Sequence, residues 1–264
     1  MASFTAKDIQ ALRQSAGVGM LDAKKALEEN DGDMEKATSW LREQGISSAA
    51  KRSDRDASQG AVSVIKDGPV AAIVSLRCET DFVAKAAEFV SLVDEMTAKV
   101  AEEGTGAVDS FKDTIDQMRT TLKENISVGD VVRLEAGADE VVDTYLHIQA
   151  GRGVNAIIVV LKNGSEELAH DIAVHVAFAK PQFARREDVP EDEVAKERAT
   201  IEAISRNEGK PEASLEKIID GRMNGWFKER VLLEQPFAKD DKKSVQQILG
   251  DAELVSFAQV VVGS

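Results

Sequence analysis

The sequence AVSVIKDGPVAAIVSLR, residues 61–77, decides the fold class of this chain. It holds two apolar runs rich in β-branched residues, AVSVI and VAAIVSLR, on either side of Lys66-Asp67-Gly68-Pro69. Strand-forming runs separated by a short segment with Gly and Pro are typical of a β-hairpin. We therefore predict an antiparallel pair of strands at this point of the chain.

Helices and further strands are expected after this hairpin. Helical composition marks residues 83–103, 108–124 and 165–179, and strand composition marks residues 131–135, 141–149 and 154–161. The last strand, VNAIIVVL, has the continuous apolar character of a strand that is covered on both faces. The order of hairpin, helices, strands and helix predicts an α+β fold rather than a regular parallel α/β sheet.

The N-terminal segment 4–45 predicts three short helices. The second covers residues 20–29, and Asp33 can cap a third helix that ends near Gly45. A unit of about 40 residues buries only a marginal core, so it is typical of a docking module and not of an enzyme. The small and charged residues that follow, 46–59, are expected to form a linker.

Residues 190–229 differ from the rest of the chain because they are strongly charged. They predict two helices joined at Gly209-Lys210-Pro211, with only a narrow apolar stripe. This pattern indicates a projecting two-helix arm, which could pair with a copy of itself or keep its charged faces solvated. After the arm we expect a short helix near 243–249 and a last strand, LVSFAQVVV.

The formal net charge of −14 argues against nucleic acid as a direct partner, because proteins that bind phosphate backbones usually carry a basic surplus. Acidic side chains outnumber basic ones two to one in residues 57–179 and nearly balance them in the N-terminal segment and the arm. The N-terminus lacks the apolar run of a signal peptide, and no stretch approaches about 18 uninterrupted apolar residues. We therefore expect a cytoplasmic protein with no membrane contact.

Motifs of enzymatic chemistry are weak in this chain. No phosphate-binding loop of the form GxxxxGK[ST] is present, and GRGVN at 151–155 is typical of a tight turn before a strand. His170 and His175 are five residues apart, so they do not lie one above the other on a helix as metal ligands would. A hydrolase that uses Cys78 with a histidine and Asp81 is one alternative, and a buried structural role for this cysteine is the other.

The segment CETDFVAK, residues 78–85, joins a strand to a helix and has two interpretations. In the structural one, Thr80 or Asp81 caps the helix and Phe82 is buried beside it as a hydrophobic staple. In the functional one, Phe82 projects at the start of the helix and inserts into a partner as an aromatic anchor. The residue types alone leave both interpretations open.

Four segments together resemble the bacterial elongation factor Ts family. They are LRQSAGVGMLDAKKAL (12–27), CETDFVAK (78–85), HDIAVHVAFAKPQF (170–183) and EGKPEASLEKIIDGRMNGWFKERVLLEQPF (208–237). They follow one another in the order found in the family and extend over essentially the whole chain. No single motif is long, but four motifs in register leave little room for chance.

The resemblance implies a domain organisation. It implies a three-helix domain similar to ubiquitin-associated domains, a core of two α+β subdomains with antiparallel sheets, and a coiled-coil arm inserted in the second subdomain. The corresponding ranges are 1–45 for the docking domain, 46–59 for the linker, 60–138 for the first core subdomain, 139–184 with 230–264 for the second, and 185–229 for the arm.

The resemblance also implies a function in translation elongation. The family binds the GTPase elongation factor Tu and acts as its guanine-nucleotide exchange factor; it is not an enzyme and needs no cofactor or metal of its own. It promotes release of GDP by disturbing the magnesium and phosphate site of that partner. A plain scaffold, in which the arm serves oligomerisation, is the alternative and predicts no effect on nucleotide release.

Site residues follow from the resemblance position by position. The segment that reaches the magnesium and phosphate region of the partner corresponds to Thr80, Asp81, Phe82 and Val83. The residues that dock the partner correspond to Leu12, Met20, Leu21 and His147.

Overall fold

The computed structural model of the chain describes residues 4–16, 18–50 and 55–263, the side chains of 45–50 excepted. The N-terminal part consists of α1 (Ala6–Ala16), α2 (Met20–Glu29) and α3 (Met34–Ala50) around a small apolar core. Asp33 caps α3 as expected, because its Oδ1 accepts the backbone N–H groups of Glu35 and Lys36 at 3.0 and 3.1 Å. The predicted end of α3 near Gly45 is wrong, since the helix continues to Ala50 and contacts α6.

The hairpin predicted from residues 61–77 is confirmed. It consists of β1 (Gln59–Asp67) and β2 (Val70–Cys78), which pair antiparallel from Gln59 opposite Cys78 to Asp67 opposite Val70. Gly68 in the turn has a φ of +56°, a conformation that glycine adopts without strain. β3 (Ser127–Glu135) pairs antiparallel with β2 and completes the first three-stranded sheet.

The helical segments between β2 and β3 are divided differently from the prediction. The predicted helix 83–103 is two helices, α4 (Asp81–Ala84) and α5 (Ala87–Glu103). The predicted helix 108–124 starts as the 3-10 turn η1 (Thr105–Phe111) and continues as α6 (Lys112–Leu122). α6 ends because Lys123 adopts a left-handed backbone conformation with φ of +59°.

A second three-stranded antiparallel sheet has the order β4-β5-β8. Its strands are β4 (Glu140–Gln149), β5 (Arg152–Lys162) and β8 (Glu253–Val261). The helix α7 (Glu166–Ala179) covers one face of it. The turn predicted at 151–155 is shorter than expected, because it consists of Ala150 and Gly151, the latter at φ of +80°, and β5 already begins at Arg152. The remaining short elements are η2 (Arg186–Asp188), η3 (Leu232–Glu234), β6 (Pro236–Phe237), β7 (Asp240–Ser244) and α10 (Val245–Leu249).

The two sheets pack face to face, which explains the continuous apolar run in β5. Alternate residues of β5 such as Ile158 face the first sheet, where they join Ile73 of β2 in one cluster. The intervening residues such as Ile157 pack under α7. α5 covers the outer face of the first sheet. The result is a helix–sheet–sheet–helix core, so the predicted α+β class is confirmed.

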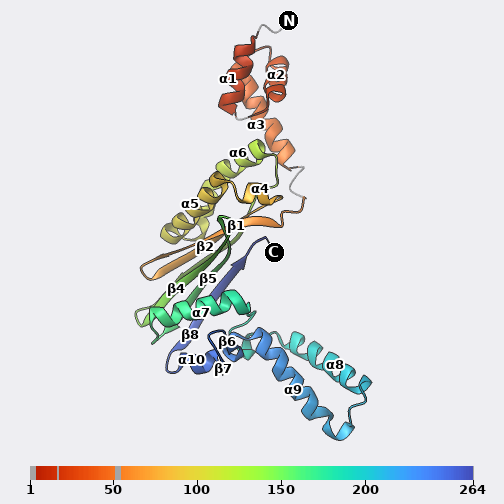
Figure 1. Cartoon of the computed structure of the whole chain (residues 1–264). Coiled ribbons are helices and arrows are strands. Elements are labelled where there is room, and N and C mark those ends of the chain that lie inside the picture. Colours follow the sequence, from red (N-terminus) through yellow and green to blue (C-terminus); the bar gives the residue numbers. More distant parts are fainter. Residues whose placement is uncertain (1–3, 17, 51–54, 264) are drawn as a thin grey trace.

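The arm projects from the end of the core opposite to the three N-terminal helices (Figure 1). It consists of α8 (Glu191–Asn207) and α9 (Glu212–Arg230), as predicted from the charged segment. Its apolar stripe packs inside the hairpin, where Ile201, Leu215, Ile219 and Met223 are buried. Among the described residues, no helix combines the length and apolar character needed to cross a membrane.

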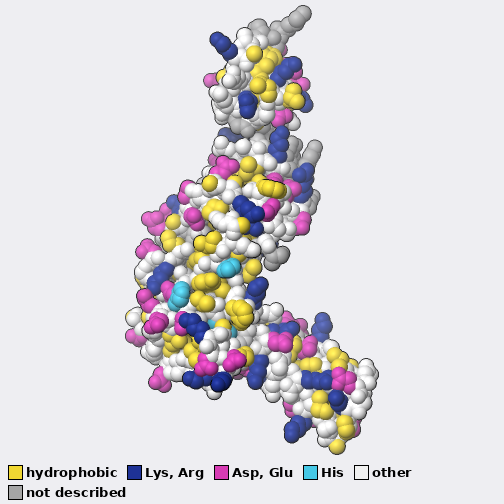
Figure 2. Space-filling view, viewed as in Figure 1, with side chains coloured by type: hydrophobic (Ala, Val, Ile, Leu, Met, Phe, Trp, Pro, Cys, Tyr) yellow, Lys and Arg dark blue, Asp and Glu magenta, His cyan; other side chains and the backbone are white. Residues whose placement is uncertain are grey.

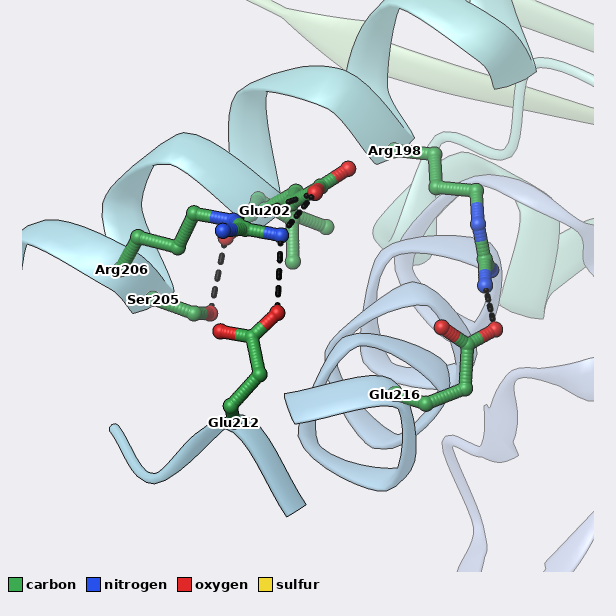
Figure 3. Close-up of polar contacts among 7 residues, drawn as sticks. Arg198, Glu202, Ser205, Arg206, Glu212 and Glu216 are labelled. Atoms are coloured by element: carbon green, nitrogen blue, oxygen red, sulfur yellow. Dashed lines mark hydrogen bonds and ion pairs between the residues drawn. The ribbon is translucent and has the colours of Figure 1, made fainter. Parts of the chain in front are cut away.

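Ion pairs between the two helices flank the apolar stripe of the arm (Figure 3). Arg198 of α8 contacts Glu216 of α9 at 2.5 Å, and Arg206 of α8 contacts Glu212 at the start of α9 at 3.1 Å. Ser205 is buried beside them and donates its hydroxyl to the Ile201 carbonyl within α8. The hairpin therefore buries most of its apolar stripe and pairs charged side chains between its own helices, while Ile204 of α8 is left 45% exposed.

Candidate partner-binding site

The candidate site is built around α4, a helix of only four residues between β2 and α5. Thr80, one of the two residues predicted to cap this helix, is its N-cap. Its Oγ1 accepts the backbone N–H of Val83 at 3.4 Å. The Cys78 thiol donates to the Thr80 carbonyl at 3.2 Å. Val83 and Ala84 are buried in the core of the first sheet and α5. These contacts fix α4 on its inner side.

Phe82 points away from this core and is 83% exposed. The interpretation of Phe82 as a buried staple is therefore wrong. The physical reason is that Val83 and Ala84 occupy the buried side of the short helix, which leaves Phe82 on the outer side. An exposed phenylalanine on a capped and anchored turn has the geometry of an aromatic anchor for a partner protein.

Asp81 precedes Phe82 and forms an ion pair with Lys85, whose Nζ lies 2.5 Å from Asp81 Oδ2. The hydrogen bond from Lys85 is the largest cause that lowers the pKa of Asp81, and partial desolvation opposes it. The positive charge of Arg152 lowers this pKa further. Asp81 therefore presents a negative charge beside the exposed ring at neutral pH.

Glu124 is part of this site and was missed by the sequence analysis. It follows α6, and its Oε2 accepts the backbone N–H groups of Glu79 and Thr80, both at 3.1 Å. Its Oε1 accepts the hydroxyl of Thr80 at 2.5 Å. No local pattern could have identified it, because Glu124 and Thr80 are 44 residues apart in the chain.

The docking residues assigned to the N-terminal helices fall into two groups. Met20 and Leu21 lie at the start of α2 and are 51% and 81% exposed. Leu12 on α1 has no exposed surface and belongs to the core of the three helices. The structure therefore corrects Leu12 from a contact residue to a core residue that holds α1 and α2 in place.

His147 lies near the end of β4 and is exposed, with its Nδ1 3.5 Å from the hydroxyl of Tyr145. It lines a hollow of about 480 Å³ together with Phe178 on α7. Phe178 and Ile148 are 80% and 62% exposed. Neither residue was predicted to be exposed, because Phe178 fits the pattern of its apolar helix and Ile148 that of its apolar strand.

The predicted site residues do not converge on one cavity. Phe82, the Met20 and Leu21 pair, and His147 lie on three separate parts of the structure: α4, α2 and the end of β4. Figure 2 shows hydrophobic side chains spaced along one face, from the three helices down to the region of α7, with charged side chains between them. Such a distribution suits contact with an extended protein surface rather than with a small molecule.

Groups with possible chemical reactivity are held in inert environments. Cys78 is fully buried, and burial raises the pKa of its thiol to about 12, so its thiolate is not available at neutral pH. This environment gives no support to the hydrolase alternative, which needs a reactive Cys78. His175 is buried between Gln235 Oε1 at 3.0 Å and the backbone N–H of Ala238 at 3.1 Å. Within the part of the chain that the structure describes, no group of three or more His, Cys, Asp or Glu side chains could hold a metal ion.

Comparison with known proteins places this architecture in a family. The family model "Elongation factor TS" matches residues 79–264. Proteins named elongation factor Ts from Clavibacter sepedonicus and Kineococcus radiotolerans are 43% and 41% identical to this chain over 278 residues, which cover the whole of both proteins in each case. The protein of that name from Mycobacterium ulcerans is 41% identical over 273 residues, which cover 100% of this chain and 99% of that protein. The chain belongs to the elongation factor Ts family.

Proposed function

We propose that the chain is a guanine-nucleotide exchange factor of translation elongation that binds elongation factor Tu and promotes release of its GDP, so that GTP can bind. Membership of the elongation factor Ts family supports this function. The observation that carries the mechanism is Phe82, 83% exposed on a turn whose other side is anchored in the core. The role is one of binding, with no bond made or broken by the chain itself.

Nucleotide release follows from linkage between two binding events. If the chain binds the nucleotide-free partner more tightly than the nucleotide-bound partner, then it weakens nucleotide binding by the same factor. Each tenfold of weakening requires about 1.4 kcal/mol of differential binding energy. The proposed source of this energy is contact that forms only when the nucleotide site of the partner is opened.

Phe82 and Asp81 are proposed to open that site. Magnesium bridges the nucleotide phosphates and requires near-ideal octahedral geometry, so a shift of about 1 Å in the segment that supports it releases much of its binding energy. Phe82 would drive this shift as a rigid apolar wedge, and the charge of Asp81 would help to hold the displaced backbone. Thr80 caps α4 and Val83 is buried on its inner side, so both would fix the position of Phe82.

Docking energy is proposed to come from surfaces away from the wedge. Met20 and Leu21 offer an exposed apolar pair on α2, and His147 lies beside exposed apolar groups on the second sheet. Self-association through the arm stays a proposal, because most of its apolar stripe is buried within the hairpin but Ile204 of α8 is 45% exposed. Pairing with a second copy would use Ile204 and the charged outer faces of the two helices.

The test is release of a fluorescent GDP analogue from elongation factor Tu in the presence of excess unlabelled GDP. We expect the chain to accelerate release in a concentration-dependent and saturating manner. An unrelated acidic protein of similar net charge is the control. Release at the rate of elongation factor Tu alone would support the scaffold alternative and contradict the proposed function.

A further inference from the structure

Glu124 holds the turn that carries the proposed wedge. Its carboxylate, half-buried in the loop between α6 and β3, accepts the backbone N–H of Glu79, the backbone N–H of Thr80 and the hydroxyl of Thr80. A further hydrogen bond runs in the opposite direction, from the backbone N–H of Asn125 to Glu79 Oε1 at 2.7 Å. We call these four hydrogen bonds the latch. Two segments far apart in the sequence are thereby joined directly in front of α4.

The Thr80 hydroxyl transmits this contact to the helix. It donates its single proton to Glu124 Oε1 and accepts the Val83 N–H with a lone pair. A carboxylate can only accept, so it fixes the direction of the hydroxyl proton and leaves the oxygen lone pairs for the cap. Removal of Glu124 would free the hydroxyl to rotate and would leave two backbone N–H groups without their acceptor.

α4 needs such external support because it is too short to be stable alone. Its four residues form about one turn, and the first turn of a helix is the unfavourable step of helix formation. Support from the core comes from Val83 and Ala84 on the inner side. Glu124 is the charged group that fixes the entry of the turn, which sets where Phe82 points.

We propose that Glu124 is a positioning residue for nucleotide exchange, acting through Thr80 on the orientation of Phe82. This inference rests on the proposed function, since it concerns the same wedge. Glu124 itself need not touch the partner. Its loss should lower the rate of GDP release at saturating exchange factor more than it weakens binding, because the docking surfaces remain intact.

The experiment compares Glu124→Ala with Glu102→Ala, which removes an exposed carboxylate at the end of α5 in the same part of the core. We expect Glu124→Ala to lower the saturating rate of GDP release about tenfold, with a less than about threefold change in the half-saturating concentration. Glu102→Ala is expected to match the parent chain in both. A parent-like saturating rate for Glu124→Ala would overturn the inference.

Amide hydrogen exchange supplies a readout that does not depend on elongation factor Tu. The backbone amides of Glu79 and Thr80 should exchange faster in Glu124→Ala, whereas Ile73 in the middle of β2 should be unchanged. If Glu124→Ala fails to fold, Glu124→Gln replaces it. The glutamine oxygen can still accept backbone N–H groups, but its NH₂ cannot accept the Thr80 hydroxyl proton, so an intermediate slowing is expected. Unchanged exchange at both amides in Glu124→Ala would contradict the proposed latch. In Glu124→Gln both amides keep an acceptor, so there a parent-like saturating rate of GDP release is the contradicting result.

A double-mutant cycle separates failure of this inference from failure of the proposed function. If Glu124 acts through Phe82, Glu124→Ala should add nothing to the slowing caused by Phe82→Ala. Fully additive effects would overturn the inference while leaving the wedge in place. A Phe82→Ala variant that exchanges nucleotide as fast as the parent would instead contradict the wedge, and the amide measurement would still decide whether Glu124 holds the turn.

Discussion

Lys123 Nζ lies 3.2 Å from Asp22 Oδ2, so the residue next to Glu124 contacts the helix that carries Met20 and Leu21. The neighbouring Glu124 contacts the turn that carries Phe82. One loop after α6 therefore touches two of the surfaces proposed to contact the partner. The two contacts differ in kind, because the ion pair is exposed and the Glu124 contacts are half-buried.

Lys123→Ala should change partner binding only slightly. The Lys123 and Asp22 side chains are 64% and 49% exposed, and exposed ion pairs contribute about 1 kcal/mol or less. We expect the dissociation constant of the complex with elongation factor Tu to change by less than about fivefold in calorimetric titrations. A much larger loss would show that the ion pair, and not the packing of α3 against α6, holds the N-terminal helices in place.

Met20→Asp should weaken the complex without unfolding the chain. Met20 is half-exposed, so a carboxylate there stays hydrated in the free chain but loses hydration when the surface is covered by a partner. We expect a loss of affinity of at least about tenfold with an unchanged unfolding transition. Leu12→Ala is the contrasting variant: it should destabilise the helices by about 2–5 kcal/mol, because Leu12 is buried. Unchanged affinity for Met20→Asp would show that α2 does not contribute to partner binding.

The stability of the arm should depend more on its apolar stripe than on its ion pairs. Ile219→Ala removes a buried side chain between α8 and α9 and should destabilise the hairpin by about 2–4 kcal/mol. Arg198→Met removes the exposed ion pairs with Glu216 and Asp220 and should change stability little. Amide exchange within α8 and α9 measures both effects. A larger loss of protection in Arg198→Met than in Ile219→Ala would contradict this order.

Stability should fall as the pH is lowered through the range in which unfolded histidine gains a proton. Burial lowers the pKa of His175 below its usual value, more than the hydrogen bond to Gln235 raises it. The unfolded chain therefore protonates His175 at a higher pH than the folded chain does. The contribution of His175 to stability is complete above the unfolded pKa of about 6.5 and decreases below it. In the folded state the backbone N–H of Ala238 donates a hydrogen bond to Nδ1 of His175. A protonated ring carries a hydrogen on Nδ1 and could not accept this bond.

The free energy of unfolding measured between about pH 7.5 and pH 5.5 tests this expectation. The parent chain should lose stability on acidification. His175→Gln should be less stable than the parent at the upper pH but should show a smaller dependence on pH. Equal pH dependence in both chains would mean that His175 does not contribute to it.

Local patterns predicted the parts of the fold that local interactions decide. The doubly covered strand β5 and the Gly209-Lys210-Pro211 turn of the arm were found where the sequence indicated. The first hairpin was also found there, although its turn is only Gly68-Pro69, since Lys66 and Asp67 belong to β1. Helix ends were less predictable. Gly45 does not end α3, although glycine is a common helix terminator.

The site was only partly predictable, because its geometry depends on contacts between distant segments. Thr80 was identified as a possible cap from its own neighbours. The exposure of Phe82, by contrast, depends on which side of α4 packs against α5 and the first sheet. Glu124 has no distinguishing local pattern, and only the fold brings it to Thr80.

The most direct test of the central claim compares Phe82→Ala with the parent chain in release of a fluorescent GDP analogue from elongation factor Tu. Val255→Ala, a truncation of an exposed apolar side chain on β8, is the matched control. We expect Phe82→Ala to lower the saturating release rate by at least about tenfold, the loss expected for an aromatic anchor, and Val255→Ala to match the parent. Release as fast with Phe82→Ala as with the parent would show that Phe82 does not open the nucleotide site.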